Sequence, residues 1–96
     1  MILHTLNATP SSAPFAQCLA LATAQDCILL MGSGVYGALD ASEGWRQLSA
    51  SPAKICALRP DVQAAGVEAR LAAVELVDYD GFVALSERFP RQLAWY

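Results

Sequence analysis

The sequence predicts an α/β fold, a three-layer α/β/α sandwich with a mainly parallel five-stranded sheet. Short apolar runs alternate with helical stretches along all 96 residues, which is typical of parallel strands joined by crossover helices. The run at residues 27–31 is apolar throughout. A strand buried on both faces has such a run, so helices are expected on each side of the sheet. We expect residues 1–96 to form one domain, because a second core would need roughly 50 more residues.

The first strand and the first helix are expected within the opening quarter of the chain. Residues 2–6 form an apolar run, and a polar turn at residues 7–14 separates this run from the helix. Ser11 or Ser12 can cap the helix, which we expect over residues 15–23. The turn also contains two prolines, and one of them suits the first turn of the helix.

The middle of the chain continues the alternation. The second strand, at residues 27–31, ends at Gly32-Ser33-Gly34, where the chain turns into a short helix expected at residues 35–39. Residues 40–53 contain a glycine, several serines and a proline, so we expect them to be irregular. The third strand is expected at residues 54–58.

The last third of the chain predicts two more helices and two more strands. A short helix is expected at residues 60–65, followed by a fourth strand at residues 75–77. Asp78 can cap the last helix and Pro90 ends it, before a final strand at residues 92–96. The apolar positions of the last helix are Phe82, Leu85 and Phe89.

The charge balance excludes some partners and indicates others. Nine acids and six bases give a net charge of −3, and no cluster of bases is present. We therefore expect no direct nucleic-acid binding by this chain alone. Charged residues are only 16% of the chain and the mean hydropathy is +0.36, which is apolar for a small monomer. This composition predicts an oligomer that hides part of its surface in interfaces.

The sequence also predicts where the protein works and what it lacks. No apolar run reaches the ~18 residues of a membrane span, and the opening residues do not resemble a signal peptide. We therefore expect a cytoplasmic protein, in which thiols stay reduced. The three cysteines are widely spaced, which predicts no disulfide framework. With one histidine and no CxxC pair, we expect no structural zinc site. We also expect no other metal and no cofactor.

Gly32-Ser33-Gly34 is the first candidate for a chemical role. It follows a strand and opens a helix, so its backbone amides could hold an anion with the help of the helix N-terminus. The competing interpretation is a tight turn that needs the flexibility of glycine. We favour the turn, because no dinucleotide-binding glycine motif and no phosphate-binding lysine follows.

The cysteines and the histidine are the other candidates. Cys27 and Cys56 lie inside expected strands, where cysteines are usually small buried apolar residues. Cys18 lies in the middle of the first helix with no base nearby in sequence, so packing is favoured over a reactive thiolate. His4 lies in the first strand, and no serine, cysteine or acid stands at a diagnostic spacing from it. We interpret it as a structural, hydrogen-bonded histidine.

Five segments, in the same order along nearly the whole chain, resemble the DsrH/TusB family of sulfur-relay proteins. They are Leu3-His4-Thr5-Leu6-Asn7 with Pro10, Gly34-Val35-Tyr36, Ala57-Leu58-Arg59-Pro60-Asp61-Val62 with Ala65-Gly66, Val77-Asp78-Tyr79-Asp80-Gly81-Phe82-Val83-Ala84-Leu85, and Gln92-Leu93-Ala94-Trp95. The sequence departs from the family pattern at Ser33, where an aspartate is usual.

This resemblance implies a DsrE/F/H-like fold and a place in a heterohexamer with two copies each of three related proteins. The partners implied are TusC-like and TusD-like subunits. The resemblance implies that the complex takes persulfide sulfur from a TusA-like donor. It passes the sulfur through a cysteine of the TusD-like subunit to a TusE-like acceptor, for 2-thiolation of the wobble uridine of certain tRNAs. In the Dsr branch of the family, the related complex serves sulfur trafficking in sulfur oxidisers.

Three functional hypotheses follow. The first is a non-catalytic subunit of a Tus-type sulfurtransferase complex. The second is a sulfur-carrying subunit that uses Cys18, because the resemblance places Cys18 where Dsr-type members commonly carry a cysteine. The third is a small anion-binding module that uses Gly32-Ser33-Gly34. Aromatic residues are enriched in interfaces, so we name Tyr36, Trp95 and Tyr96 as interface candidates.

Overall fold

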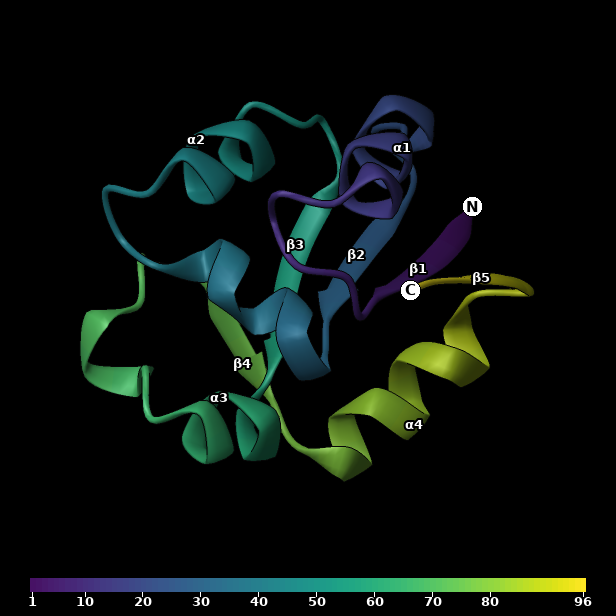
Figure 1. The fold of residues 1–96 in the computed structure, drawn as a ribbon. Helices are drawn as coiled ribbons and strands as arrows, with labels where there is room; N and C mark the ends of the chain where they lie inside the picture. Colours follow the sequence, from purple (N-terminus) through teal and green to yellow (C-terminus); the bar gives the residue numbers. More distant parts are fainter.

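The computed structural model describes residues 1–96 and contains one five-stranded sheet in which every neighbouring pair of strands is parallel (Figure 1). The strands are β1 (Ile2–Leu6), β2 (Cys27–Leu30), β3 (Lys54–Leu58), β4 (Glu75–Val77) and β5 (Arg91–Trp95). Their order across the sheet is β4-β3-β2-β1-β5. All four residues of β2 are buried, as the continuous apolar run predicted. The expected α/β class with a parallel five-stranded sheet is therefore confirmed.

Helices cover both faces of the sheet, but unequally. The helical segments are α1 (Ala13–Leu21), the 3-10 helix η1 (Gly32–Ala38), α2 (Glu43–Ser49), α3 (Arg59–Ala65), the 3-10 helix η2 (Glu68–Arg70) and α4 (Tyr79–Arg88). The core of one face includes side chains of α1, η1, α2 and α3. The core of the other face includes only α4 among the helices. Neighbouring residues of a strand enter different cores, as Ile28 and Leu29 do.

The direction of the strand connections explains this asymmetry. From β1 to β4 the chain steps one strand at a time toward one edge of the sheet. The last connection, through α4, returns past β3, β2 and β1 and places β5 at the opposite edge (Figure 1). Parallel crossovers are almost always right-handed, so a step in the reverse direction must run across the reverse face. Helix α4 is therefore alone on its face.

The prediction of an irregular segment at residues 40–53 was wrong, because α2 lies within it. The Ser42 hydroxyl accepts a hydrogen bond from the Trp45 N–H at 3.1 Å and caps this helix. The glycine that suggested irregularity, Gly44, is buried at a close contact. A Cβ atom there would lie 3.0 Å from the Cβ of Pro10 and 3.2 Å from the Cα of Gly37. The lack of a side chain at Gly44 therefore allows α2 to pack closely against these two residues, and Gly44 does not end a helix.

Other helices and strands begin or end a few residues from the predicted positions, for reasons found in the local structure. Helix α1 begins at Ala13, because Ser12 rather than Ser11 accepts the capping hydrogen bond. The short helix expected at residues 35–39 is the 3-10 helix η1 and begins at Gly32. At the C-terminal end of α3, Gly66 has a φ of 71° and ends the helix in the left-handed conformation. Asp78 caps α4 as predicted, with its carboxylate 2.7 Å from the Gly81 N–H.

The helices of this fold are short. None of them is long and apolar enough to pass through a lipid bilayer.

Candidate functional site

Cys18 lies on the face of α1 that packs against the sheet, and its exposed fraction is 0%. Burial raises the pKa of its thiol to about 12, and the negative charge of Asp26 adds to the effect. The thiol is therefore protonated at neutral pH. A persulfide carrier needs a thiolate that a partner can reach. The structure gives Cys18 neither property.

Cys27 and Cys56 are both buried, as predicted, and the structure brings their sulfur atoms within 3.9 Å of each other across β2 and β3. The Cys56 thiol also lies 3.5 Å from a carboxylate oxygen of Glu75. The hydrogen bond with Cys27 raises the pKa of Cys56, and burial and the Glu75 charge act in the same direction. Both cysteines belong to the buried apolar cluster that packs against Leu85 of α4.

His4 is fully buried and connects two residues that are remote in sequence. The Trp95 indole N–H donates to His4 Nδ1 at 3.1 Å, and His4 Nε2 lies 3.0 Å from an Asp26 oxygen. Since Nδ1 accepts, the neutral ring carries its proton on Nε2 and donates it to the carboxylate. The spacing of residues along the sequence did not identify an acidic partner for His4. Asp26 lies beside His4 only because β1 pairs with β2.

The Asp26 carboxylate is held as a buried anion. Burial by itself raises its pKa, but hydrogen bonds from the His4 ring and from the backbone N–H groups of Thr23 and Ile2 outweigh burial and lower the pKa to about 2. Asp26 is 4% exposed, so its carboxylate is closed to a substrate. This network ties β1, β2 and β5 together and is structural, as we interpreted His4.

The Gly32-Ser33-Gly34 segment forms the start of η1 at the carboxyl end of β2. Only glycine fits at position 34, because a Cβ atom there would lie 2.0 Å from the Leu6 carbonyl oxygen. The Gly32 N–H donates to Oδ2 of Asp61 at 2.7 Å, and the Gly34 N–H donates to the Met31 carbonyl at 2.8 Å. A carboxylate of the chain itself therefore occupies the position that a bound anion would take. This geometry favours the tight turn over the anion site.

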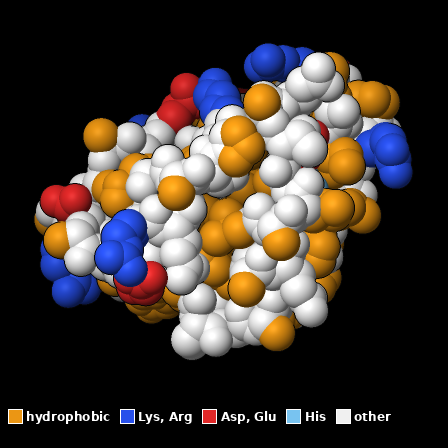
Figure 2. Space-filling model, turned by 90° about the horizontal axis from the view of Figure 1, so that it is seen from above, with side chains coloured by type: hydrophobic (Ala, Val, Ile, Leu, Met, Phe, Trp, Pro, Cys, Tyr) orange, Lys and Arg blue, Asp and Glu red, His pale blue; other side chains and the backbone are white.

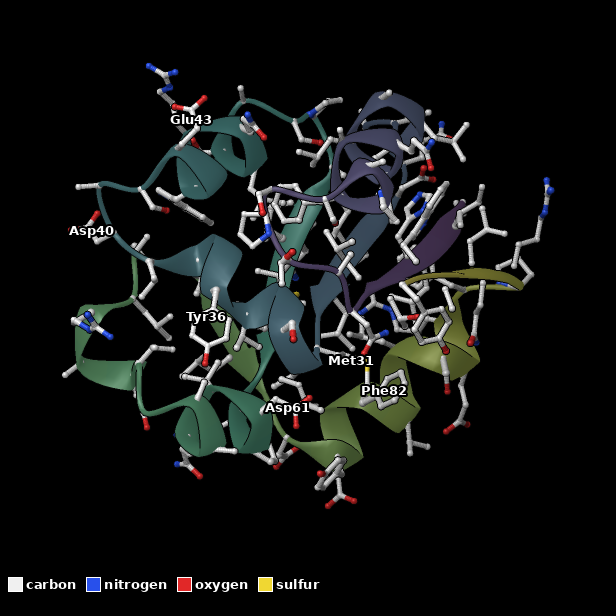
Figure 3. All side chains as sticks on the ribbon, in the orientation of Figure 1. Met31, Tyr36, Asp40, Glu43, Asp61 and Phe82 are labelled. Atoms are coloured by element: carbon white, nitrogen blue, oxygen red, sulfur yellow. The ribbon has the colours of Figure 1, made fainter.

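A pocket of about 280 Å³ opens beside this turn, between η1 and α3. It is lined by Gly32, Ser33, Tyr36, Asp61, Ala64 and Ala65. Tyr36 belongs to η1 and Asp61 belongs to α3, and the two residues lie on the same side of the molecule (Figure 3). In open α/β sheets, ligand-contacting residues gather at the carboxyl ends of strands. That rule could have singled out Asp61, which follows β3 and which the sequence reasoning did not name as a site residue.

The interface candidates differ in their surroundings. Tyr36 is 41% exposed and Tyr96 is 81% exposed, so both aromatic side chains lie at the surface of the chain. Trp95 is only half-buried, but its indole N–H is directed inward to His4.

A second hollow, of about 460 Å³, lies between α1 and α2, and none of its lining residues is charged. Seen from above, hydrophobic side chains gather in the middle of this face while most charged side chains lie toward its margins (Figure 2). The lining residues are Ala16, Leu19, Ala20, Gln47 and Ala50.

Comparison with known proteins identifies the family. The model of the DsrH family, described as DsrH like protein, matches residues 9–92. The chain belongs to the DsrH family. It is 36% identical over 95 residues to Protein TusB of Escherichia coli strain K12 and to Protein TusB of Sodalis glossinidius, covering 98% of this chain and 100% of each relative. The resemblance that the five sequence segments suggested is therefore confirmed.

Two solved structures share the fold of this DsrH-family chain. One is the solution NMR structure of protein Tm0979 from Thermotoga maritima, with a TM-score of 0.70 and 28% identity, covering 92% of this chain and 93% of that one. The other is the crystal structure of the ychN protein from E. coli, with a TM-score of 0.76 and 13% identity, covering 98% and 97%. The latter likeness shows the fold alone.

Proposed function

We propose that this chain is a non-catalytic subunit of a heteromeric, TusBCD-like sulfurtransferase complex. The complex relays persulfide sulfur toward 2-thiolation of the tRNA wobble uridine. Membership of the DsrH family and full-length identity to Protein TusB support sulfur relay for tRNA modification in general terms. The finer assignment, in which this subunit carries no sulfur itself, rests on the state of its thiols.

The burial of Cys18 is the observation that carries this assignment. In a persulfide relay, the thiolate of the acceptor attacks the terminal sulfur of the donor persulfide. The S–S bond breaks, and the donor leaves as a thiolate. The acceptor sulfur and the terminal sulfur of the donor must therefore both be exposed at the surfaces of their proteins. Cys18 has an exposed fraction of 0% and a pKa of about 12, and the other two cysteines are buried as well. The reactive cysteine therefore belongs to a partner.

The partners in this proposal are TusC-like and TusD-like subunits, in a heterohexamer with two copies of each chain. A TusA-like donor and a TusE-like acceptor act on the complex. The low charged fraction and the exposed aromatic residues support association with other chains. Since the end product is a modified tRNA, we assign the subunit to the cytoplasm.

The test compares loss of the thiol with loss of the chain. In cells that lack this protein, we expect wobble 2-thiouridine to disappear from digested tRNA, as measured by nucleoside mass spectrometry. Cys18→Ala should restore it as well as the wild type does, and Cys27→Ala is the matched control for a missing buried sulfur.

A sulfur-carrying role would give the opposite pattern. Cys18→Ala would then abolish thiolation while the complex remained assembled, whereas Cys27→Ala would not. The wild-type chain would gain ~32 Da after incubation with a persulfide donor and lose it on reduction.

A further inference from the structure

The pocket between η1 and α3 contains an acid that no base neutralises. Asp61 is the only charged residue among the six that line it. Its Oδ2 accepts the Gly32 N–H at 2.7 Å, whereas Oδ1 takes part in no hydrogen bond or ion pair within the chain. The nearest base along the sequence, Arg59, does not line the pocket. A carboxylate oxygen thus remains free at a defined place.

The rest of the pocket fits a flat cationic group. Tyr36 lines the pocket and is 41% exposed. Ala64 and Ala65 of α3, which have small side chains, line the pocket together with Asp61 (Figure 3 labels Tyr36 and Asp61). A guanidinium group stacks on aromatic faces and donates in-plane hydrogen bonds to carboxylates, and a lysine ammonium does not match both surfaces equally well.

We propose that this pocket receives an arginine side chain of a neighbouring protein subunit. The guanidinium donates to Asp61 Oδ1 and lies against the Tyr36 ring. The inference rests on the proposed function, because the neighbour is one of the partner subunits of the complex. The pocket, of about 280 Å³, has room for one arginine side chain. The same Asp61 holds the Gly32 turn, so the turn positions the carboxylate for the partner.

The first arm of the test measures assembly. Native mass spectrometry of the purified complex, diluted in steps, compares the wild type with Asp61→Asn. Asparagine keeps an oxygen for the Gly32 N–H but removes the charge. We expect at least about tenfold weaker association, because a hydrogen bond to a charged group contributes more than about 1.4 kcal/mol. Asp80→Asn, the same change at an exposed acid in the first turn of α4, should leave association unchanged.

A second variant guards against misfolding of the first. Tyr36→Ala removes the aromatic ring without touching Asp61, and it should also weaken association. Thermal unfolding followed by circular dichroism shows whether each variant is folded. If folded Asp61→Asn and Tyr36→Ala chains both assemble like the wild type, the inference is overturned while the proposed function stands. If the wild type itself binds no partner subunits, the proposed function fails.

The second arm tests the chemistry of the pocket on the full chain alone. Two-dimensional NMR follows the Gly32 amide while N-acetyl-arginine-methylamide is added, with the neutral analogue N-acetyl-citrulline-methylamide as control. We expect the arginine compound to shift the Gly32 signal and the citrulline compound to leave it unchanged. The shift should be lost in Asp61→Asn and kept in Asp80→Asn. Equal effects of the two compounds would overturn the inference, whatever the first arm shows.

Discussion

At the scale of single residues, buried polar groups in this protein are compensated in pairs and chains. His4, Asp26 and Trp95 satisfy one another across three strands, and no buried side-chain nitrogen or oxygen lacks a partner. An unpaired buried polar group would cost about 1–3 kcal/mol. The network therefore has a structural explanation that does not require a catalytic role for the histidine.

The Asp26 anion makes a testable contribution to stability. Its pKa is lowered from 3.8 to about 2 in the folded state. A lowered pKa stabilises the fold at pH values above the unfolded pKa, and the contribution is lost as pH falls through the folded pKa. It amounts to about 2 kcal/mol near neutral pH.

We expect Asp26→Asn to lower the free energy of unfolding near neutral pH by about 3 kcal/mol, because an amide N–H would also face backbone donors. Urea unfolding should show this deficit shrinking as pH falls from about 4 through about 2. Asp80→Asn, at an exposed acid, is the control and should change little. A deficit that does not depend on pH would contradict the lowered pKa.

The thiols give a second prediction at this scale. With a pKa of about 12, roughly one Cys18 side chain in 100,000 is a thiolate at neutral pH. We expect iodoacetamide to leave Cys18 unmodified in the native chain, as read by peptide mass spectrometry. In urea all three cysteines should react. Rapid native modification of Cys18 would favour the sulfur-carrying hypothesis instead.

At the scale of elements, the contact between β1 and η1 decides where the pocket lies. Gly34 lies so close to the end of β1 that a Cβ atom there would be 2.0 Å from the Leu6 carbonyl oxygen, and the same oxygen accepts the Met31 N–H at 3.0 Å. Tyr36 follows two residues after Gly34 in η1. The motif Gly34-Val35-Tyr36 thus combines a backbone requirement, a buried core residue and an exposed aromatic ring.

We expect Gly34→Ala to destabilise the chain by more than about 3 kcal/mol, because its Cβ would overlap the Leu6 carbonyl oxygen and the backbone would have to shift. Ser33→Ala, at the exposed neighbouring position, should stay within about 0.5 kcal/mol of the wild type. Denaturant midpoints measure both. A mild effect of Gly34→Ala would mean that η1 can move away from β1.

At the scale of the whole molecule, one face of the sheet is covered by a single helix, and aromatic side chains lie at the surface. Tyr96 is 81% exposed at the end of the edge strand β5. Trp95, one residue earlier, holds β5 to β1 through His4. Adjacent aromatic residues thus have different tasks, one within the chain and one at its surface.

The two positions should separate in experiment. Trp95→Phe removes the hydrogen bond to His4 and should lower the free energy of unfolding by about 1–2 kcal/mol. Tyr96→Ala should leave unfolding within about 0.5 kcal/mol of the wild type. If Tyr96 contacts a partner, Tyr96→Ala reduces the mass of the complex in size exclusion with light scattering. An unchanged mass would remove Tyr96 from the interface.

The sequence by itself determined the class of the fold, because local features carry that information. The apolar run of β2 predicted a strand buried on both faces, and Asp78 predicted the start of α4. The family was also readable from five ordered segments, which the match over residues 9–92 confirmed. The sequence did not predict helix α2, because glycine has a low helix propensity and Gly44 suggested a loop. Glycine is needed at this position because Pro10 and Gly37 lie too close for a side chain.

Only the tertiary structure decided the state of the candidate site residues, since these depend on neighbours distant in sequence. Parallel strands that pair side by side can be remote along the chain, so spacing reveals neither Asp26 beside His4 nor Asp61 beside Gly32. The exposure of Cys18 likewise follows from which side of α1 meets the sheet. Local residue types select the elements, whereas packing between elements sets burial, pKa and the opening of a pocket.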